Sequence, residues 1–430
     1  MINHEITQKL ISYQVPHLIE TITILDKIHI CLDTSDTGTG KTYTSMAIAK
    51  HYNSKPFIVS PKTIMSTWEY VANYFGIQPL AIVNYETLVL GKYYDAKGRR
   101  VVCPYLKKIN GEYIWNLPNN TIIIFDEAHH CCSQGTLVNR LLHGLIDVYG
   151  KDRKLLLLSA TIADTVDKFK IFGLLIKWYN CYAKAPDWVT NAKFNPNYAI
   201  KLIHQKLYPN YATRMAISNL IDYPKKQITV DLYTVDNPNK INKKYDKLID
   251  AKKDLGFGLG LLIGKIVKLR QKIESCKIDL FVDLANEYLQ NGFSVVIFVN
   301  FIKTLEMIAK KLNTTCVICG KQTLNTRHQN IQKFMNNIEK VIICNIQAGS
   351  ESISLHDKVG NFPRVALISP TWSATKFIQA TGRIHRADSK SIALNKIVLC
   401  AKTIEEKIFI KLKAKINNIN ELNEEDLEEF

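Results

Sequence analysis

The sequence lacks any apolar run of the ~18 residues that a helix needs to cross a bilayer. Residues 1–5 (MINHE) also lack the pattern of a secretory signal peptide. We therefore expect a soluble intracellular protein with no membrane partner, in a compartment that the sequence does not specify. At 430 residues and 47% hydrophobic composition, the chain is long enough for two or three domains with sizeable cores.

The cysteines lack the paired spacing of a zinc site. There are ten of them, and Cys316 and Cys319 form a CxxC that no second pair at zinc spacing accompanies. Several others lie inside apolar runs, where cysteine behaves as a small hydrophobe. We expect reduced thiols and no zinc.

Acidic residues are scarce relative to basic ones. The chain has 39 Asp and Glu against 56 Lys and Arg, which gives a formal net charge of +17. This excess favours a polyanionic partner, and nucleic acid is the first candidate. Lysines scattered over solvated surfaces would give the same net charge, so charge alone does not identify the partner.

The stretch 35–42 (SDTGTGKT) predicts a phosphate-binding loop. An apolar, strand-like run at 28–32 precedes it, and residues 43–50 follow with helical spacing. Glycine lets backbone N–H groups approach phosphates, lysine adds a cation, and a threonine hydroxyl can bind Mg²⁺. Ser35 replaces the first glycine of the full pattern, and a Gly/Thr-rich turn is the alternative. The candidate ATP-binding residues are Thr37, Gly38, Thr39, Gly40, Lys41 and Thr42, and Thr42 is also a candidate Mg²⁺ ligand.

Two adjacent acids form the second strong signal. Asp126 and Glu127 directly follow the apolar run 121–125 (TIIIF). Asp126 is predicted to hold Mg²⁺ through water, and Glu127 to orient and deprotonate the water that attacks the γ-phosphate. The alternative is a pair of acids at the start of a helix.

Weaker signals accompany these two. Gln14 lies upstream of the loop, and its amide could read the edge of adenine, although a surface glutamine is the alternative. Polar residues also follow two further strand-like runs, where ligands of parallel sheets bind. These candidate nucleic-acid contacts, for which ordinary turns are the alternative, are Ser60, Lys62, Ser159 and Thr161.

The alternation of strands and helices stops near residue 165 and returns near 290. Five later strand-like runs predict a second α/β lobe: 294–300, 316–320, 341–345, 364–370 and 396–400. The predicted divisions are a first lobe at 1–185, a mostly helical insertion at 186–278 with a strand at 228–234, a second lobe at 279–415, and an acidic tail at 416–430.

The second lobe has its own candidate site in residues 379–386 (QATGRIHR). Arg383 and Arg386 would share one face if this stretch is helical, and guanidinium groups stabilise charge that develops on a γ-phosphate. Surface arginines paired with acids are the alternative. Gly349 and Ser350 lie in a loop of small residues suited to approach by ATP and a nucleic-acid strand.

In this order the motifs resemble those of the superfamily 2 helicases and translocases. The resemblance covers almost the whole chain and rests on Gln14 and on residues 38–42, 60–62, 126–129 (DEAH), 159–161, 348–355 and 379–386. It implies an α/β fold of two RecA-like lobes with parallel sheets, ATP and Mg²⁺ as cofactors, and nucleic acid bound across both lobes. It also places Gln379 beside Arg383 and Arg386 among the catalytic residues.

Within this superfamily the chain is most similar to the Swi/Snf-type translocases of double-stranded DNA. The similarity is carried by residues 213–215, 223–226, 269–271, 297–301 and 404–407. Residues 159–161 and Gly382 instead resemble strand-separating helicases, including those of large DNA viruses, and Ser350 and Ser352 replace common glycines.

The function that we expect is an ATP-hydrolysing motor that steps along duplex DNA and relies on partner proteins for recruitment. A strand-separating DNA or RNA helicase, a transcription-associated DNA-dependent ATPase and a nucleic-acid-binding factor with an inactive nucleotide site are the alternatives. The sequence carries no signal for oligomeric state.

Overall fold

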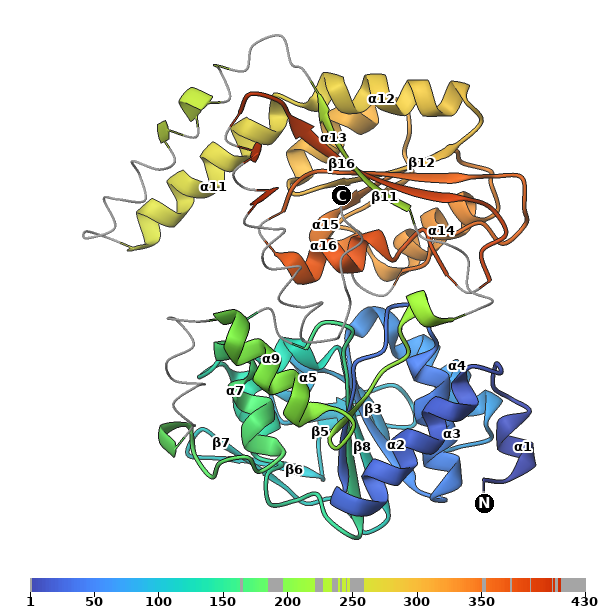
Figure 1. Ribbon diagram of the computed structural model, residues 1–430, viewed down its shortest axis with the longest axis vertical. Helices are drawn as coiled ribbons and strands as arrows, with labels where there is room; N and C mark the ends of the chain where they lie inside the picture. The colour runs from blue at the N-terminus through green and yellow to red at the C-terminus, as the bar shows by residue number, and fades with distance from the viewer. Residues whose placement is uncertain are drawn as a thin grey trace. The chain divides into compact units, whose positions relative to one another are not determined.

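Figure 1 shows the computed structural model of the chain. The structure describes residues 2–162, 165–184, 196–220, 227–233, 239, 242–244, 246–247, 259–349, 353–371, 373–386, 388–403, 405–406 and 409–410. The chain divides into two compact units, one within Met1–Ile221 and the other within Asp222–Ile416. The predicted acidic tail lies outside the described residues.

The first unit is built on a six-stranded sheet in the order β10-β1-β9-β8-β2-β3, and every neighbouring pair is parallel. Its strands are β1 (Ile30–Asp33), β2 (Lys55–Ser60), β3 (Ala81–Asn84), β8 (Thr121–Asp126), β9 (Arg153–Leu158) and β10 (Ala212–Thr213). Every residue of β1 and β8 is buried, which explains why both strands are apolar almost throughout.

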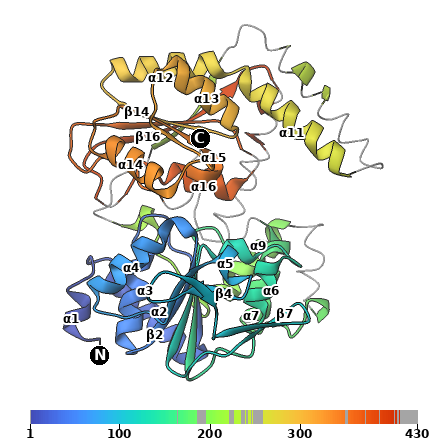
Figure 2. The same ribbon diagram turned by 180° about the vertical axis from the view of Figure 1, so that it is seen from behind.

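Helices cover both faces of this sheet. Figures 1 and 2 show α2 (Gln14–Ile28), α3 (Lys41–His51) and α4 (Met65–Tyr74) on one face. The other face carries α7 (Val166–Leu175) and α9 (Pro196–Leu207). Alternate residues of β8 enter two separate cores: Ile122 and Ile124 pack with the first set of helices, and Ile123 and Phe125 with the second. The shorter helices of this unit are α1 (His4–Thr7), α5 (Tyr85–Leu88), α6 (Leu137–His143), η1 (Lys62–Ile64), η2 (Ala128–Cys131), η3 (Tyr182–Lys184) and η4 (Ile217–Asn219).

Between α5 and β8 the chain forms two antiparallel hairpins. The first pairs β4 (Lys92–Tyr94) with β5 (Arg100–Val102), and the second pairs β6 (Leu106–Ile109) with β7 (Glu112–Trp115). Leu106 and Trp115 lie opposite each other and are buried in the core of the unit. The hairpins are therefore packed onto the first unit through one face.

The second unit contains another six-stranded parallel sheet, in the order β11-β16-β15-β12-β14-β13. Its strands are β11 (Gln227–Tyr233), β12 (Ser294–Val299), β13 (Val317–Ile318), β14 (Val341–Asn345), β15 (Arg364–Ile368) and β16 (Ala393–Cys400). Its helices are α11 (Leu259–Ser275), α12 (Ile278–Gln290), α13 (Ile302–Lys311), α14 (Leu324–Met335), α15 (Ile346–Gly349) and α16 (Ala374–Thr381). Helices α12 and α13 cover one face, and α14, α15 and α16 lie across the sheet from them (Figures 1 and 2).

These two sheets confirm the α/β fold with two parallel-stranded lobes. Residues of the predicted insertion complete both sheets, because β10 pairs with β1 in the first unit and β11 pairs with β16 in the second. Strand β10 is two residues long and leaves no periodic pattern in the sequence. None of the helices described is both long and apolar enough to span a bilayer.

Candidate nucleotide site and basic pocket

The chain passes from β1 into α3 through the predicted phosphate loop. Gly38 and Gly40 have φ angles of +95° and +92°, in the left-handed region that favours glycine. Gly40 is the N-cap of α3, and no side chain caps this helix end. A Cβ added to Gly40 would collide with the side-chain amide of Gln14. The loop therefore requires glycine both for its backbone conformation and for the close approach of Gln14.

Lys41 and Thr39 hold the loop from within. The Lys41 ammonium donates hydrogen bonds to the backbone oxygens of Ser35 and Asp36, at 2.6 and 3.0 Å. The Thr39 hydroxyl donates to the Asp36 oxygen at 2.9 Å. Thr37, Gly38 and Thr42 complete the segment and are all partly exposed. The predicted ATP-binding residues thus lie in one continuous segment, in which residues 37–40 form the loop and Lys41 and Thr42 begin α3.

Gln14 contacts this loop from α2. Its side chain is buried, and its amide nitrogen donates to the Thr39 oxygen at 2.8 Å. Its amide oxygen accepts from the Ile11 N–H at 3.0 Å. In this structure both ends of the amide bind protein groups, so Gln14 braces the loop. Its adenine-reading role stays a prediction.

Asp126 and Glu127 lie at the end of β8. The Asp126 side chain is buried, and its Oδ2 accepts from the Trp68 indole N–H at 2.8 Å. Burial, and second the neighbouring Glu127 charge, raise the pKa of Asp126 to about 7. The hydrogen bond from Trp68 and the charge of Lys41 act in the opposite direction but offset only part of this rise. Asp33 at the end of β1 and Asp126 at the end of β8 both lie opposite Leu158 of β9, so the strand that leads into the loop and the strand that carries the two acids end at the same edge of the sheet. Carboxylate and hydroxyl oxygens are the ligands that Mg²⁺ prefers, so Asp126 and Thr42 suit this ion.

Glu127 begins a chain of polar contacts that crosses to the next strand. Its backbone is left-handed, with φ of +56°, and its Oε2 lies 3.3 Å from His129 Nδ1. The same nitrogen lies 3.1 Å from the Ser159 hydroxyl oxygen, which in turn accepts from the Thr161 N–H at 3.2 Å. The predicted water-activating acid is thus linked to residues 159–161, which follow β9.

The structure separates the predicted nucleic-acid contacts of this unit into two kinds. Ser60, Ser159 and Thr161 are at most 1% exposed, whereas Lys62 is exposed at the end of β2. A strand bound to this conformation would therefore meet Lys62 rather than the three hydroxyls.

In the second unit, Arg383 and Arg386 converge on one backbone oxygen. Arg383 Nη1 donates to the Ile353 oxygen at 3.2 Å, and Arg386 Nη2 donates to it at 3.3 Å. The predicted helix face is wrong in one respect, because α16 ends at Thr381, before both arginines. Gln379 lies on α16 itself, and both Gln379 and Arg383 are buried.

Gly349 ends α15, where space is restricted. A Cβ added to Gly349 would lie 2.6 Å from the Cys344 Cβ, so the helix packs closely on β14 only because this residue is glycine. The neighbouring candidate, Ser350, lies outside the described residues.

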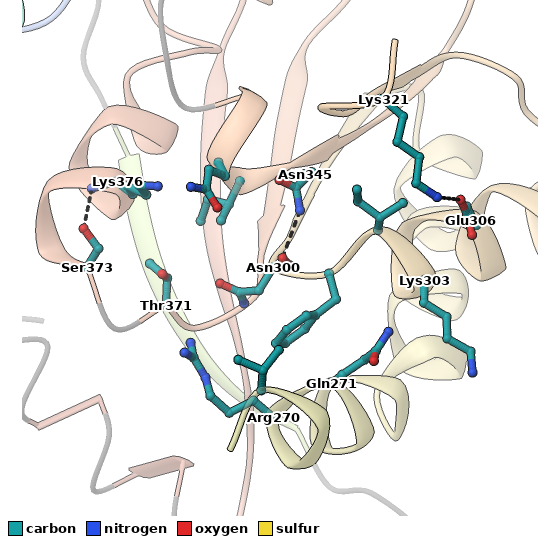
Figure 3. Close-up of a pocket in the computed structure, with 15 residues that line it drawn as sticks. Arg270, Gln271, Asn300, Lys303, Glu306, Lys321, Asn345, Thr371, Ser373 and Lys376 are labelled. Carbon is teal, nitrogen blue, oxygen red and sulfur yellow. Dashed lines mark hydrogen bonds and ion pairs between the residues drawn. The ribbon is translucent and has the colours of Figure 1, made fainter. Parts of the chain in front are cut away.

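A basic pocket of about 870 Å³ lies within the second unit. Figure 3 shows the polar side chains of Asn300, Asn345 and Thr371 on its wall. Its one acidic lining residue, Glu306, forms an ion pair with Lys321 at 3.3 Å. The cationic lining residues are Arg270, Lys303, Lys321 and Lys376. The pocket therefore carries a net positive charge and a set of hydrogen-bonding groups, as a site for an anionic ligand requires.

Sequence reasoning missed the chemical role of the stretch that follows β10. Arg214 forms an ion pair with Asp36 of the phosphate loop, with Nη2 and Oδ1 2.8 Å apart. The Ser35 hydroxyl, where the family pattern has glycine, accepts from the Met215 N–H at 2.9 Å. The residues lie about 180 positions apart in the chain, so no local pattern could have revealed the contact.

Comparison with known proteins gives matches at both ends of the chain. Residues 8–164 match the family described as type III restriction enzyme, res subunit, and residues 276–388 match the helicase conserved C-terminal domain. A protein of Acanthamoeba polyphaga mimivirus described as "Putative ATP-dependent RNA helicase" is 36% identical over 460 residues, which cover 99% of this chain and 86% of that protein.

Two further matches are more distant. The Mus musculus "DNA excision repair protein ERCC-6-like" is 29% identical over 143 residues, which cover 32% of this chain and 11% of that protein. Among solved structures, the Sulfolobus solfataricus SWI2/SNF2 ATPase core in complex with dsDNA matches 94% of this chain and 90% of that chain. This match has 17% identity and a TM-score of 0.39.

Proposed function

The chain belongs to the superfamily 2 helicases, and from that premise we propose that it is a motor that uses ATP hydrolysis to move along double-stranded DNA. As a member of this family it is an ATP-dependent nucleic-acid motor with two RecA-like lobes. The proposal concerns its substrate, its mode of movement and the residues that carry the chemistry.

The nucleotide site that we propose lies where β1 and β8 end. The observation that carries it is the register of the parallel sheet: Asp33, at the end of β1, and Asp126, at the end of β8, both lie opposite Leu158 of β9. Residues 37–42 and Gln14 would bind ATP, with the Lys41 ammonium on its phosphates. Thr42 and Asp126 would hold Mg²⁺, which neutralises phosphate charge when bound.

Glu127 is the proposed general base. Its carboxylate follows directly on Asp126 and faces His129, so it is held at the same strand end as the proposed metal ligand. There it would orient the attacking water and accept its proton. Arg383 and Arg386, with Gln379 on the preceding helix α16, would stabilise the charge that develops on the γ-phosphate during turnover.

Nucleic acid would bind in part at the basic pocket of the second unit. Four cations and one paired acid line this pocket, and its amide and hydroxyl groups can donate to phosphate oxygens. Ser350 is the candidate contact after the strand that ends at Asn345, a lining residue, whereas its neighbour Gly349 is proposed to approach ATP. In the first unit Lys62 is the exposed candidate contact. These contacts read the backbone of the strand, so we expect binding with little sequence preference.

A strand-separating RNA helicase is the second candidate. The mimivirus relative, which matches nearly the whole chain, is described as an RNA helicase. Residues 159–161 and Gly382 also resemble strand-separating enzymes more than duplex translocases. For either candidate we also propose recruitment by partner proteins and a viral setting.

Steady-state ATP hydrolysis measured without nucleic acid, and in parallel with duplex DNA, single-stranded DNA and RNA, tests the proposal. Selective stimulation by duplex DNA is expected, whereas stimulation by single strands would favour the helicase. No hydrolysis under any condition would leave only a binding factor. Lys41→Ala provides the background rate, since it removes the proposed phosphate-binding cation.

Salt dependence tests the pocket separately. Binding that involves six to ten phosphates should weaken by roughly 10³ to 10⁵ between 50 and 200 mM salt. Lys303→Gln should weaken binding to all sequences equally and reduce the magnitude of the logarithmic salt slope by about 1. Lys310→Gln is the matched control, because Lys310 is exposed on the same helix and does not line the pocket. A flat salt response would refute backbone binding.

A further inference from the structure

Residues 213–217 lie along the start of the phosphate loop. Strand β10 pairs in parallel with β1, and the Thr34 N–H donates to the Thr213 oxygen at 2.9 Å. The Asp36 N–H donates to the Met215 oxygen at 3.0 Å, which continues the pairing past the end of β1. The first residues of the loop are therefore held by backbone hydrogen bonds to a segment about 180 residues away in the chain.

Side chains reinforce this pairing at both loop residues. The Ser35 hydroxyl accepts from the Met215 N–H at 2.9 Å. Asp36 is bound through both carboxylate oxygens: Oδ1 accepts from Arg214 Nη2 at 2.8 Å, and Oδ2 accepts from the Ile217 N–H at 2.9 Å. Arg214 Nη1 donates to the Thr34 oxygen at 2.8 Å. We refer to residues 213–217 as the loop clamp.

The loop clamp resolves an electrostatic conflict in the site. A carboxylate in a loop that receives phosphates repels them, because both groups are anionic. Arg214 places a guanidinium on this carboxylate, and the two side chains are only 8% and 20% exposed, so solvent screens their interaction incompletely. The pair removes the repulsion that Asp36 alone would exert on a triphosphate.

We propose that Arg214 is a positioning residue for ATP, which neutralises Asp36 and holds residues 34–36 of the phosphate loop in the shape that receives phosphates. This inference rests on the proposed nucleotide site. It adds a residue that lies outside the motifs quoted above for phosphate binding and catalysis. It also accounts for Ser35, whose hydroxyl gives the clamp a hydrogen bond that glycine would lack.

The two partners should have opposite effects on ATP binding. Arg214→Met leaves the Asp36 charge beside the phosphates, so KM for ATP should rise by on the order of tenfold. We expect kcat to change by less than about threefold, because the proposed base and metal ligand are untouched. Asp36→Asn removes the repelling charge and should lower KM below that of the wild type. The double variant should have a lower KM than Arg214→Met alone.

The measurement is basal ATP hydrolysis in the full chain, together with equilibrium binding of a fluorescent ATP analogue. Arg99→Met is the matched control, because Arg99 pairs with Asp95 at the same 2.8 Å on a hairpin of the same unit. This variant should leave KM unchanged. Thermal unfolding of each variant shows that it is folded.

Two results would overturn the proposal. If Asp36→Asn raises KM as Arg214→Met does, the pair acts as a structural unit and not through charge. If Arg214→Lys, which retains the charge but not the planar fork, raises KM as much as methionine does, neutralisation is also wrong. If the methionine variant fails to fold, Asp36→Asn is compared with the wild type instead: a KM above that of the wild type overturns the proposal, and a lower KM supports it. Lys41→Ala distinguishes a wrong nucleotide site from a wrong role for Arg214. If Lys41→Ala still binds ATP normally, the proposed nucleotide site is wrong. If Lys41→Ala loses ATP binding but Arg214→Met binds ATP normally, the site stands and the role proposed for Arg214 is wrong.

Discussion

Both units contain a parallel strand that a short connection joins to the next helix. The two connections differ in the groups that lie where the helix begins. At the junction of β1 with α3, two glycines with left-handed backbone form a loop, and no side chain caps the helix. At the junction of β12 with α13 the cap residue Phe301 makes no side-chain cap either, but the carboxylate of Glu274 accepts hydrogen bonds from the N–H groups of Asn300 and Phe301, the two residues before the helix, at 2.7 and 3.0 Å.

The same strand-to-helix connection can bind an anion of the protein itself or leave room for the anion of a ligand. The N-terminus of a helix attracts an anion through its N–H groups and its dipole. The second unit places the buried Glu274 carboxylate of α11 against the N–H groups just before α13, and the same carboxylate accepts from the Asn300 side-chain amide at 2.8 Å. In the first unit we propose that the same kind of position receives phosphate. This difference gives a physical reason why we propose the β1–α3 junction, and not the β12–α13 junction, as the nucleotide-binding loop.

The largest effect should come from removal of the acid Glu127, which lies at the end of β8 and not in the junction of β1 with α3. Glu127→Gln keeps the shape of the side chain but cannot accept a proton, and general bases contribute about 10² to 10⁴ in rate. We expect kcat to fall by about that factor while ATP affinity is retained, as measured by turnover and by nucleotide binding. Glu112→Gln on the β7 hairpin should have no effect. Normal turnover in Glu127→Gln would refute the proposed base.

Gly40→Ala should break the first junction itself. The added methyl group meets Gln14, and the left-handed backbone costs about 1 to 2 kcal/mol for a residue other than glycine. We expect ATP affinity to fall by roughly 10- to 100-fold in equilibrium binding, equivalent to about 1.4 to 2.8 kcal/mol. Gly76→Ala is the control, since Gly76 has φ of +63° and nothing within 4 Å of an added Cβ. If both variants bind ATP like the wild type, the loop does not carry the phosphates.

Glu274→Gln should break the second junction without any effect on the first. Loss of the charge weakens hydrogen bonds to three N–H donors in a buried position, so the free energy of unfolding should fall by about 1 to 3 kcal/mol. Denaturant unfolding measures this change, and ATP affinity should stay constant. Glu287→Gln, on the exposed face of α12, should leave both quantities unchanged. A loss of ATP affinity in Glu274→Gln would contradict the separation of the two junctions.

The sequence predicted the segments of the proposed site that are contiguous in the chain, and their roles stay predictions. The loop at 37–42 and the acids at 126–127 each follow an apolar strand, so a local pattern carries both. Glu274 and Arg214 could not be found in this way, because each binds a strand end formed elsewhere in the chain. The arginines at 383 and 386 were placed on a helix that ends at Thr381, yet they still converge on Ile353, because the loop beyond α16 turns them toward it.

The smallest effect that we expect is on the pH dependence of the unfolding free energy, through Asp33 at the first junction. Asp33 ends β1, accepts from the Ser35 N–H at 2.9 Å, and lies 3.1 Å from buried His17. Burial acts to raise the pKa of Asp33, but the charge and hydrogen bond of His17, the charge of Lys41 and the bond from Ser35 together lower it from 3.8 to about 2. The folded-state pKa is therefore below the ordinary value.

This carboxylate consequently stabilises the first unit at pH above about 4, by about 2 kcal/mol, and the contribution is lost as pH falls from about 4 through about 2. Between pH 6 and pH 3 the wild type should lose about 1 kcal/mol more unfolding free energy than Asp33→Asn does, as measured by urea unfolding. Asp152→Asn, at an exposed acid before β9, should show the slope of the wild type. Equal slopes for the wild type and Asp33→Asn would mean that the charge of Asp33 does not hold the phosphate loop, and that the first junction depends on its glycines and the loop clamp alone.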